Sequence, residues 1–574
     1  MKSLHILSFL ALPYAAAVLG AQIPLKDPFS REPWRSAGRA AGSARWRFDV
    51  EPSPNATENY VFETVASLLQ QWPNTRYRNG HSIVPATIPV GTLLYHGTDK
   101  EKVPDNPNWV ATDPEHSFLF CRTVEEGKGC WHLTLAVTRP LNVLYFDGSS
   151  AAKMPGTMDA QDVLRGKVEP GRLFDEVNRI MDLCKWGRKY NLDGFMRMEM
   201  DFEIMLCNFT QGVEVASFLN LHSLQPGIPG VPNPKHIGNL PGTLLLQAFR
   251  VLEAGKTHDR FPGETRAKLD LTRLTSFYDT DMFPSLVAER YGQERWDHRV
   301  AQLGADGREQ LLSRLDDVLS STGKEQVGSG VDWTSLIRVI MHRHADRLEI
   351  LRYMLNSTGE EPAKTLSDIH DYTTSMLDPY ILHGVRPVNA SSASIEWAAP
   401  IFEVCASTHT KIISTTLKSK LTYSENLILG AVDGVLHEIC RVVVGIWAES
   451  IVLQLPGAEP RPEEDVIAEW SASVDKLMKW LDWSVWVKCN PGCSFEETCY
   501  LPTWPWLHAA WPHRPQIPLP QPPRKGGNIV PGSLERKWDR LWGWVQDFSG
   551  EVDEDYYRRP QPKCIRRVLP LVDL

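Results

Sequence analysis

The chain has 574 residues, of which 42% are hydrophobic and 23% are charged, a composition typical of globular proteins. At roughly 150 residues per domain, this length allows two to four domains. The formal net charge of -9 argues against nucleic acid as the main partner, because phosphate binding needs a basic surface.

The N-terminus has the features of a secretory signal peptide. In residues 1–21 a lysine precedes an apolar run from Leu4 to Leu19, and two small residues follow. This pattern is typical of a cleaved signal, and the run is too short to span a bilayer. The ten cysteines form an even number suited to disulfides, and glycosylation sequons begin at Asn55, Asn208, Asn356 and Asn389. We therefore predict a secreted, disulfide-bonded glycoprotein.

A membrane anchor is not expected. The most apolar later segment, Leu427 to Leu453, contains Asp433, Glu438 and Arg441, so it is predicted to be a buried helix. The C-terminal residues carry no long apolar tail of the kind that directs lipid anchoring.

The first part of the chain is predicted to be a flexible segment at residues 22–58 followed by an α+β domain at residues 59–222. Apolar spacing predicts helices at Tyr60–Gln71 and Leu173–Tyr190. Short runs with β-favouring composition predict strands at Thr92–Tyr95, Trp109–Ala111, Trp131–Val137, Asn142–Phe146, Gly194–Met198 and Phe202–Cys207. Strands mixed with helices in this way favour an α+β fold.

The second part is predicted to be helical. Proline and glycine mark a linker at residues 223–244, and residues 245–488 follow helical periodicity. Asp332 is a predicted N-cap, and a further helix is expected at Val466–Val487. Residues 489–574 form a tail with closely spaced cysteines, a proline-rich spacer and a final amphipathic segment. The expected order is an α+β domain, a larger all-α domain and a Pro-rich tail.

One stretch, residues 91–121, brings together groups able to hold a flat ring that bears an amide. A short strand ends in a small residue, which permits close approach of the backbone to a ligand. A second short strand follows, and Pro114 then opens a helical turn. The candidate binding residues are His96, Gly97, Thr98, Trp109, Ser117 and Phe120.

These motifs resemble the ADP-ribosyltransferase domain of the diphtheria-toxin and poly(ADP-ribose) polymerase class. That class carries a His-Gly-Thr/Ser strand end, a Tyr-Phe-Ala strand, a Ser-x-x-Tyr helix start and a late strand beginning Asn-Glu-Tyr. The matching positions are His96 with Gly97, Trp109, Ser117 with Phe120, and Glu203, which Gln211 follows. The resemblance implies a split β-sheet. Residues 91–221 also resemble a family of secreted fungal proteins.

The resemblance implies a role for each matching residue. His96 would bond a ribose hydroxyl of NAD, Gly97 and Ser117 would hold the nicotinamide amide, and the two aromatic rings would stack on the nicotinamide. Glu203 would bond the 2′-hydroxyl of the nicotinamide ribose and stabilise positive charge as nicotinamide leaves. The implied reaction is transfer of ADP-ribose to an unknown acceptor, a protein or a small molecule, or hydrolysis of NAD.

Two other functions fit the same residues. Carboxylates could form a glycosidase pair, and the 20 tryptophans and secretory signal suit a carbohydrate-active or glycan-binding protein. The carboxylates concerned are Asp147, Asp159, Asp162, Asp193, Glu199 and Asp201, although Asp147-Gly148 and Asp193-Gly194 also predict turns. The third function is that of a non-catalytic accessory protein, for example in a fungal secondary-metabolite pathway.

No metal site is expected. His437-Glu438 begins like a zinc-protease helix, but Arg441 stands where that motif needs its second histidine. Cys489, Cys493 and Cys499 in a secreted chain favour disulfides over zinc.

Overall fold

The computed structural model describes residues 45–121, 130–166, 168–169, 172–221, 242–259, 263–320, 328–357, 359, 361–387, 394–503 and 554–568. The predicted signal peptide, most of the predicted linker, Asn389 and most of the Pro-rich tail lie outside these residues. The chain divides into two compact units. The mixed unit comprises Pro54–His342, Leu421–Ile428 and Asp482–Leu574, and the helical unit comprises Met1–Ser53, Arg343–Lys420 and Leu429–Leu481.

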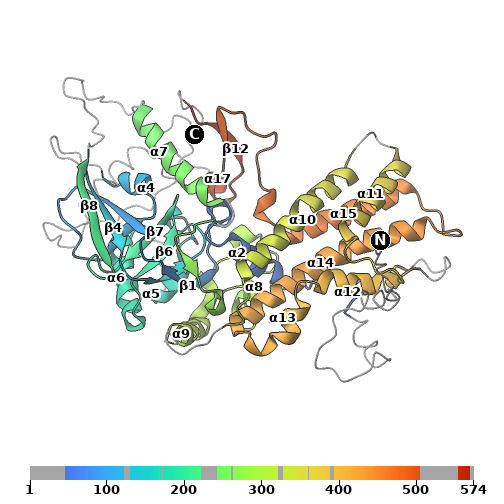
Figure 1. Cartoon of the computed structure of the whole chain (residues 1–574), viewed down its shortest axis with the longest axis horizontal. Coiled ribbons are helices and arrows are strands. Elements are labelled where there is room, and N and C mark those ends of the chain that lie inside the picture. Colours follow the sequence, from blue (N-terminus) through green and yellow to red (C-terminus); the bar gives the residue numbers. More distant parts are fainter. Residues whose placement is uncertain are drawn as a thin grey trace, which may run out of the picture. The chain divides into compact units, whose positions relative to one another are not determined.

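A ten-stranded sheet organises the mixed unit (Figure 1). Its strands are β1 (Ser82–Ile88), β2 (Leu93–Thr98), β3 (Asn108–Ala111), β4 (Cys130–Val137), β5 (Leu141–Phe146), β6 (Gly194–Met198), β7 (Phe202–Leu206), β8 (Val213–Leu221), β9 (Lys268–Leu269) and β10 (Thr275–Ser276). Their order is β10-β1-β5-β6-β7-β3-β2-β4-β8, with β9 also paired to β1. Strands β5 and β6 are parallel and the other pairs are antiparallel. The α+β prediction is confirmed.

The six predicted strands all form, but neither β1 nor β8 was predicted from the sequence, and β1 contains Pro85 within its apolar run. Proline lacks the N–H that a strand ladder uses and is therefore rare inside sheets. The pairing of β1 accommodates it: β10 pairs with Ser82 and Ile83, whereas β9 pairs with Ala86 and Thr87. Position 85 thus falls between two short partner strands.

Helices surround the sheet in the mixed unit: α2 (Glu58–Ser67), α3 (Gln71–Arg76), α4 (Pro114–Phe118), α5 (Asp159–Arg165), α6 (Glu176–Gly187), α7 (Gly242–Lys256), α8 (Ser285–Arg290), α9 (Gly304–Ser320) and α17 (Glu554–Arg558). The single predicted helix at 60–71 is instead two helices, because the backbone at Leu69 has a positive φ of 59°. A residue in this conformation ends a helix.

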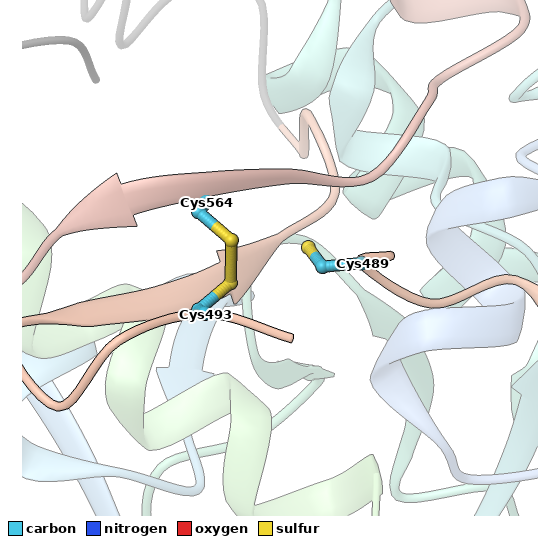
Figure 2. A group of neighbouring side chains, drawn as sticks. All are labelled: Cys489, Cys493 and Cys564. Atoms are coloured by element: carbon cyan, nitrogen blue, oxygen red, sulfur yellow. A yellow bond between two sulfur atoms is a disulfide. The ribbon is translucent and has the colours of Figure 1, made fainter. Parts of the chain in front are cut away.

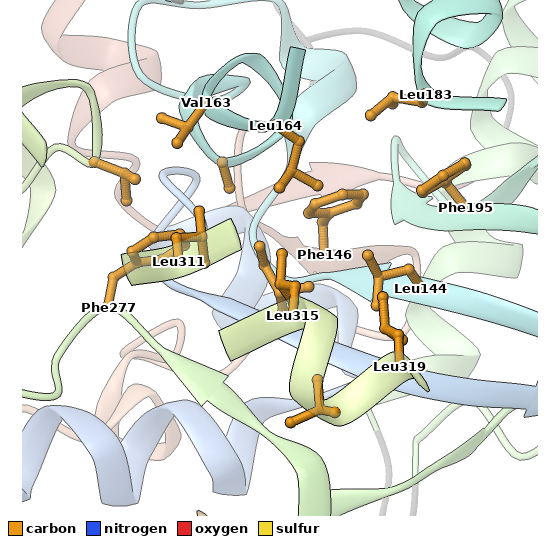
Figure 3. Close-up of a cluster of buried hydrophobic side chains, with 14 of the residues drawn as sticks. Leu144, Phe146, Val163, Leu164, Leu183, Phe195, Phe277, Leu311, Leu315 and Leu319 are labelled. Carbon is orange, nitrogen blue, oxygen red and sulfur yellow. The ribbon is translucent and has the colours of Figure 1, made fainter. Parts of the chain in front are cut away.

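The apolar core of the mixed unit lies where α5, α6 and α9 pack on the sheet. Figure 3 shows Leu144, Phe146 and Phe195 from β5 and β6 facing side chains of these helices. The helical side chains labelled there are Val163, Leu164, Leu183, Leu311, Leu315 and Leu319. Helix α9 and strands β9 and β10 belong to the mixed unit, although the sequence assigned residues from 245 onward to a helical domain. The boundary between the two compact units therefore does not lie at the predicted linker.

The helical unit contains α11 (Pro362–Leu377), α12 (Ala399–Ser407), α13 (Lys411–Thr416) and α15 (Glu463–Leu481), and α11 packs against α15. Two helices, α10 (Trp333–Leu355) and α14 (Tyr423–Leu453), contribute residues to both units. The predicted cap of α10 is confirmed, because Asp332 Oδ1 accepts a hydrogen bond of 3.0 Å from the Ser335 backbone N–H. No helix among the described residues is long and apolar enough to span a membrane.

Five disulfides pair all ten cysteines, as predicted: Cys121–Cys130, Cys184–Cys207, Cys405–Cys440, Cys489–Cys499 and Cys493–Cys564. The last of these joins two residues of the tail that precede and follow its proline-rich spacer in the sequence, near the two-stranded sheet of β11 (Glu497–Tyr500) and β12 (Lys563–Arg566) (Figure 2). Disulfides in this number are typical of chains that fold in an oxidising compartment.

Candidate functional site

Three neighbouring strands of the mixed unit carry the central residues predicted from the sequence. His96 lies on β2, Trp109 on β3 and Glu203 on β7, and these strands are adjacent in the sheet. In the strand register, Glu203 lies opposite Ala111 of β3, and His96 Nδ1 lies 2.7 Å from the Trp109 carbonyl oxygen. Trp109 and Glu203 therefore lie on the same face of the sheet as Ala111. The β2 residue that pairs with Ala111 is Tyr95, so His96, the next residue, lies on the opposite face and reaches only the backbone of Trp109.

The strand end at Gly97 packs tightly against α4. A Cβ atom at Gly97 would lie 2.2 Å from the Ser117 carbonyl oxygen, so only glycine fits there. Helix α4 begins at Pro114, as predicted, and Asp113 caps it by accepting the Glu115 N–H at 2.8 Å. The close approach predicted at Gly97 is therefore made to the backbone of this helix.

The Ser117 side chain is buried and already has two partners. Its hydroxyl donates to the Pro114 carbonyl at 3.0 Å and lies 2.7 Å from His132 Nε2. Thr98 is also buried, and its hydroxyl oxygen accepts the Lys100 N–H at 3.3 Å. These two hydroxyls hold the loops around the strand end in place.

A buried arginine connects two of the predicted residues. The guanidinium carbon of Arg197, on β6, lies 3.9 Å from the centroid of the Trp109 ring, which is the geometry of a cation–π contact. Arg197 Nε donates to Glu203 Oε1 at 2.6 Å. On its other side, Arg197 Nη2 lies 3.1 Å from Glu176 Oε2 at the start of α6. Arg197 thus lies between two carboxylates with its guanidinium over an indole ring.

Burial raises the pKa of Glu203 to about 7, the charge of Arg197 offsets part of this effect, and the nearby charge of Glu199 adds to it. A carboxylic acid with a pKa near neutrality can change its protonation state under physiological conditions. Such perturbed carboxyl groups occur preferentially at functional sites.

A second buried pair lies beside Glu203. His116 Nε2 is 2.6 Å from Glu199 Oε2, and both side chains are buried. Burial alone would lower the pKa of His116, but the hydrogen bond and charge of Glu199 outweigh this effect and raise it to about 9. His116 is therefore protonated at neutral pH. The Phe120 ring, which is 36% exposed, lies 5.8 Å from the His116 ring.

Further charged side chains lie around the two buried pairs, Arg197 with Glu203 and His116 with Glu199. Asp201 Oδ1 lies 2.7 Å from His258 Nε2, and Lys153 Nζ lies 3.9 Å from Glu176 Oε1. Most of these charged side chains are at least nine-tenths buried. Burying charge costs free energy even when the charges are paired, so such a concentration is unusual in a region that serves only folding.

Two groups of described residues have the spacing of metal ligands. Cys489, Cys493 and Cys564 are disulfide-bonded, so their sulfurs are not thiolate ligands (Figure 2). The atoms of His116, Glu199 and Glu203 lie within 4.8 Å of one another, but the first two are bonded to each other and Glu203 is bonded to Arg197. Neither arrangement calls for a metal ion, and the expectation of a metal-free protein stays a prediction.

The carboxylates considered for a glycosidase are mostly engaged elsewhere. Asp159 is paired with Arg299 and Asp162 with Arg179, while Asp193 binds Arg139 and the Asn142 N–H. Asp147 lines a cavity of about 20 Å³, which has room for about one water molecule. That cavity is lined by none of the residues predicted to bind NAD. Only Glu199 and Asp201 lie close to Glu203.

Neither Arg197 nor His116 was predicted from the sequence as a site residue. A signal for the first was present, because charged and apolar residues alternate from Arg197 through Glu199 and Asp201 to Glu203. Strands buried on both faces are normally continuously apolar, so charges at every second position indicate a polar centre. The partner of His116 could not be found from spacing, because the two residues of this pair are brought together only by the fold.

Comparison with known proteins places the chain in a family. The model of the YPL277C N-terminal domain matches residues 49–132 and 125–261, a region that includes every residue from His96 to Glu203. The uncharacterized protein YPL277C of Saccharomyces cerevisiae is 32% identical over 386 residues, which cover 52% of this chain and 76% of that protein. The chain therefore belongs to the YPL277C family.

A second yeast relative aligns over a longer part of the chain. The uncharacterized protein YOR389W of Saccharomyces cerevisiae is 24% identical over 550 residues, which cover 77% of this chain and 81% of that protein. The likeness to YOR389W thus extends well beyond the matched N-terminal domain.

Proposed function

We propose that the mixed unit binds NAD and cleaves the bond between nicotinamide and ribose, with transfer of ADP-ribose to an acceptor or to water. The observation that carries this proposal is the convergence of Trp109 and Glu203 on one planar cation, Arg197. An aromatic face beside a buried carboxylate is the environment that a nicotinamide ring and its ribose require.

In this reaction the carbon–nitrogen bond breaks, and its electron pair leaves with nicotinamide, which becomes neutral. Positive charge develops on the ribose ring, and the Glu203 carboxylate stabilises that charge. An acceptor oxygen or nitrogen, or water, then bonds to the ribose carbon and releases a proton. The proposal gives His96, which contacts the Trp109 carbonyl at 2.7 Å, the bond to a ribose hydroxyl.

The test is release of nicotinamide from labelled NAD by the full-length protein and by the Glu203→Gln variant. Loss of the carboxylate removes an electrostatic contribution of the kind worth about 100- to 1,000-fold in rate. Glu438→Gln is the matched control, because Glu438 is a buried glutamate of the helical unit bonded to Arg441 at 2.6 Å. We expect Glu438→Gln to retain full activity. Equal turnover by wild type and Glu203→Gln would end the proposal.

One observation favours a second function, glycoside hydrolysis. Carboxylate oxygens of Glu199 and Glu203 lie within 4.8 Å of each other, close to the separation of about 5–5.5 Å found in retaining glycosidases. The pairing of Glu199 with protonated His116 keeps it ionised, as a nucleophile must be, and Glu203 would be the acid. Cleavage of an oligosaccharide with no release of nicotinamide from NAD would favour this function.

We also infer that the protein is exported and glycosylated. The five disulfides and the N-terminal signal pattern support this inference. The sequon residues Asn55, Asn208 and Asn356 have exposed side chains, as attachment of a glycan requires. Detection of the protein in culture medium, with a mass that falls after glycosidase treatment, tests both points.

A further inference from the structure

The contacts of Arg197 describe a binding site that already holds a group of the protein itself. Its guanidinium lies 3.9 Å from the Trp109 centroid, its Nε donates to Glu203 at 2.6 Å and its Nη2 lies 3.1 Å from Glu176. Arg197 is buried, with 3% of its side chain exposed. The residues around Arg197 thus match three properties of its guanidinium group. The group is flat, it is positively charged and it donates hydrogen bonds at its edge.

A ligand ring and Arg197 cannot both occupy this face of Trp109 at the same time. A ring stacks at van der Waals distance, and one face of Trp109 accepts only one flat group at that distance. The Glu203 oxygen that bonds Arg197 is also part of the carboxylate proposed to bond a ribose hydroxyl. Binding of a ring on this face therefore requires that Arg197 moves away.

The nicotinamide ring of oxidised NAD shares the decisive properties of the guanidinium group. Both are planar and both carry a delocalised positive charge, whereas free nicotinamide is planar and neutral. A π face beside carboxylates stabilises a cation more than a neutral ring of the same shape. The site that holds Arg197 is therefore expected to favour a pyridinium ring and to release the neutral product.

We propose that Trp109, Glu203 and Glu176 form a subsite for planar cations, that Arg197 occupies it in the free protein, and that a ligand with a planar cationic ring binds by displacing Arg197. The assignment of that ligand as the pyridinium ring of NAD rests on the proposed function. The preference for planar cations rests only on the contacts of Arg197.

The experiment measures dissociation constants of small probes by calorimetry for wild type and Arg197→Ala. The probes are methylguanidinium and 1-methylnicotinamide, which are planar cations, nicotinamide, which is planar and neutral, and methylammonium, which is a cation without a flat face. In Arg197→Ala both planar cations should bind at least tenfold more tightly than in wild type. They should also bind at least tenfold more tightly than nicotinamide or methylammonium.

Arg266→Ala is the matched control. Arg266 is another arginine of the mixed unit, bonded to Glu264 at 2.6 Å, and no cation–π contact to it is recorded among the described residues. This variant should bind the probes no better than wild type. Equal affinity of wild type and Arg197→Ala for the planar cations, or equal affinity of Arg197→Ala for nicotinamide and its methylated cation, would overturn the proposal.

Removal of Arg197 leaves the buried carboxylate of Glu203 without this cation, so Arg197→Ala can fail to fold. In that case methylguanidinium added during refolding should restore the circular dichroism spectrum of the native protein, and methylammonium should not. Failure of rescue counts against the subsite. Arg197→Lys supplies a second variant, because it keeps a charge near Glu203 and removes the flat group. Its affinity for 1-methylnicotinamide should exceed that of wild type.

The outcomes separate this proposal from the proposed function. Tight binding of planar cations to Arg197→Ala, with no release of nicotinamide from NAD by wild type, would leave the subsite standing and remove the enzymatic activity. Nicotinamide release that depends on Glu203, with no gain in probe affinity in Arg197→Ala, would support the enzymatic activity. It would contradict the proposal that a ligand displaces Arg197.

Discussion

The two compact units bury different kinds of side chain. Around the ends of β6 and β7, the mixed unit buries Arg197, Glu199, Asp201 and Glu203 together with His116. The helical unit buries a mainly apolar surface, for example along residues 429–453 of α14, where a disulfide joins Cys440 to Cys405. Apolar burial stabilises a fold directly, whereas buried charge carries a desolvation cost. The difference supports placing the proposed activity in the mixed unit.

The largest effect on the free energy of unfolding is expected from breaking the buried pair of His116 and Glu199. His116→Gln leaves the Glu199 carboxylate buried without its cation, at a cost of about 3–5 kcal/mol. Denaturant unfolding should report this loss, and hydrogen exchange should locate it in the mixed unit. Because the folded pKa of His116 is raised to about 9, the contribution of the pair is full below the unfolded value and is lost as pH rises through 9.

A double variant tests whether charge is the cause. His116→Leu combined with Glu199→Leu removes both charges and replaces them with apolar side chains. Such replacements of a buried pair are often neutral, so most of the lost stability should return. A double variant as unstable as His116→Gln would show that packing at these positions matters more than charge.

The next effect compares a disulfide from each unit. Loop-closure entropy predicts that Cys405→Ala with Cys440→Ala lowers the free energy of unfolding by about 4 kcal/mol, because this disulfide spans 35 residues. The corresponding loss for Cys121→Ala with Cys130→Ala is about 3 kcal/mol, because that bridge spans 9 residues. Unfolding of the two double variants measures the difference. A larger loss of stability for Cys121→Ala with Cys130→Ala would contradict loop-closure entropy as the source of the difference.

A smaller effect is the pH dependence of nicotinamide release. The reaction needs ionised Glu203, whose pKa is raised to about 7 by burial. The rate should therefore increase about tenfold per pH unit below 7 and level off above it. A rate that is flat between pH 5 and pH 8, measured with the fold intact, would show that Glu203 does not titrate in the reaction.

The smallest effect on stability is expected at the sequons. Asn208 Oδ1 accepts hydrogen bonds of 2.8 Å from both the N–H and the hydroxyl of Thr210, and among the described residues its Nδ2 donates no hydrogen bond. Asn356 Nδ2, in contrast, donates to the Arg352 carbonyl at 2.8 Å. Mass spectrometry should find Asn208 more completely glycosylated than Asn356. Asn208→Gln should change stability by less than about 0.5 kcal/mol, as exposed substitutions usually do.

Much of the local structure could be predicted, because short apolar runs and capping residues act locally. Strand β6 coincides with its predicted range, Asp332 caps α10 and Pro114 opens α4. Prediction failed where tertiary pairing outweighs local preference: Pro85 of β1 pairs with Leu144 of β5, and on the other side of β1 it lies in the gap between β9 and β10. The unit boundary was missed for the same reason, because β9 and β10 are too short to be recognised outside the sheet.

The sequence by itself determined the α+β class and the pairing potential of the ten cysteines, and it predicted candidate site residues on β2, β3 and β7. It determined them because each depends on residue type or on short-range periodicity. Only the tertiary structure decided what those residues touch: Arg197 lies on Trp109 and bonds Glu203, and His116 bonds Glu199. Contacts of this kind depend on strand register and on burial, which lowers the local dielectric and gives each pair its strength.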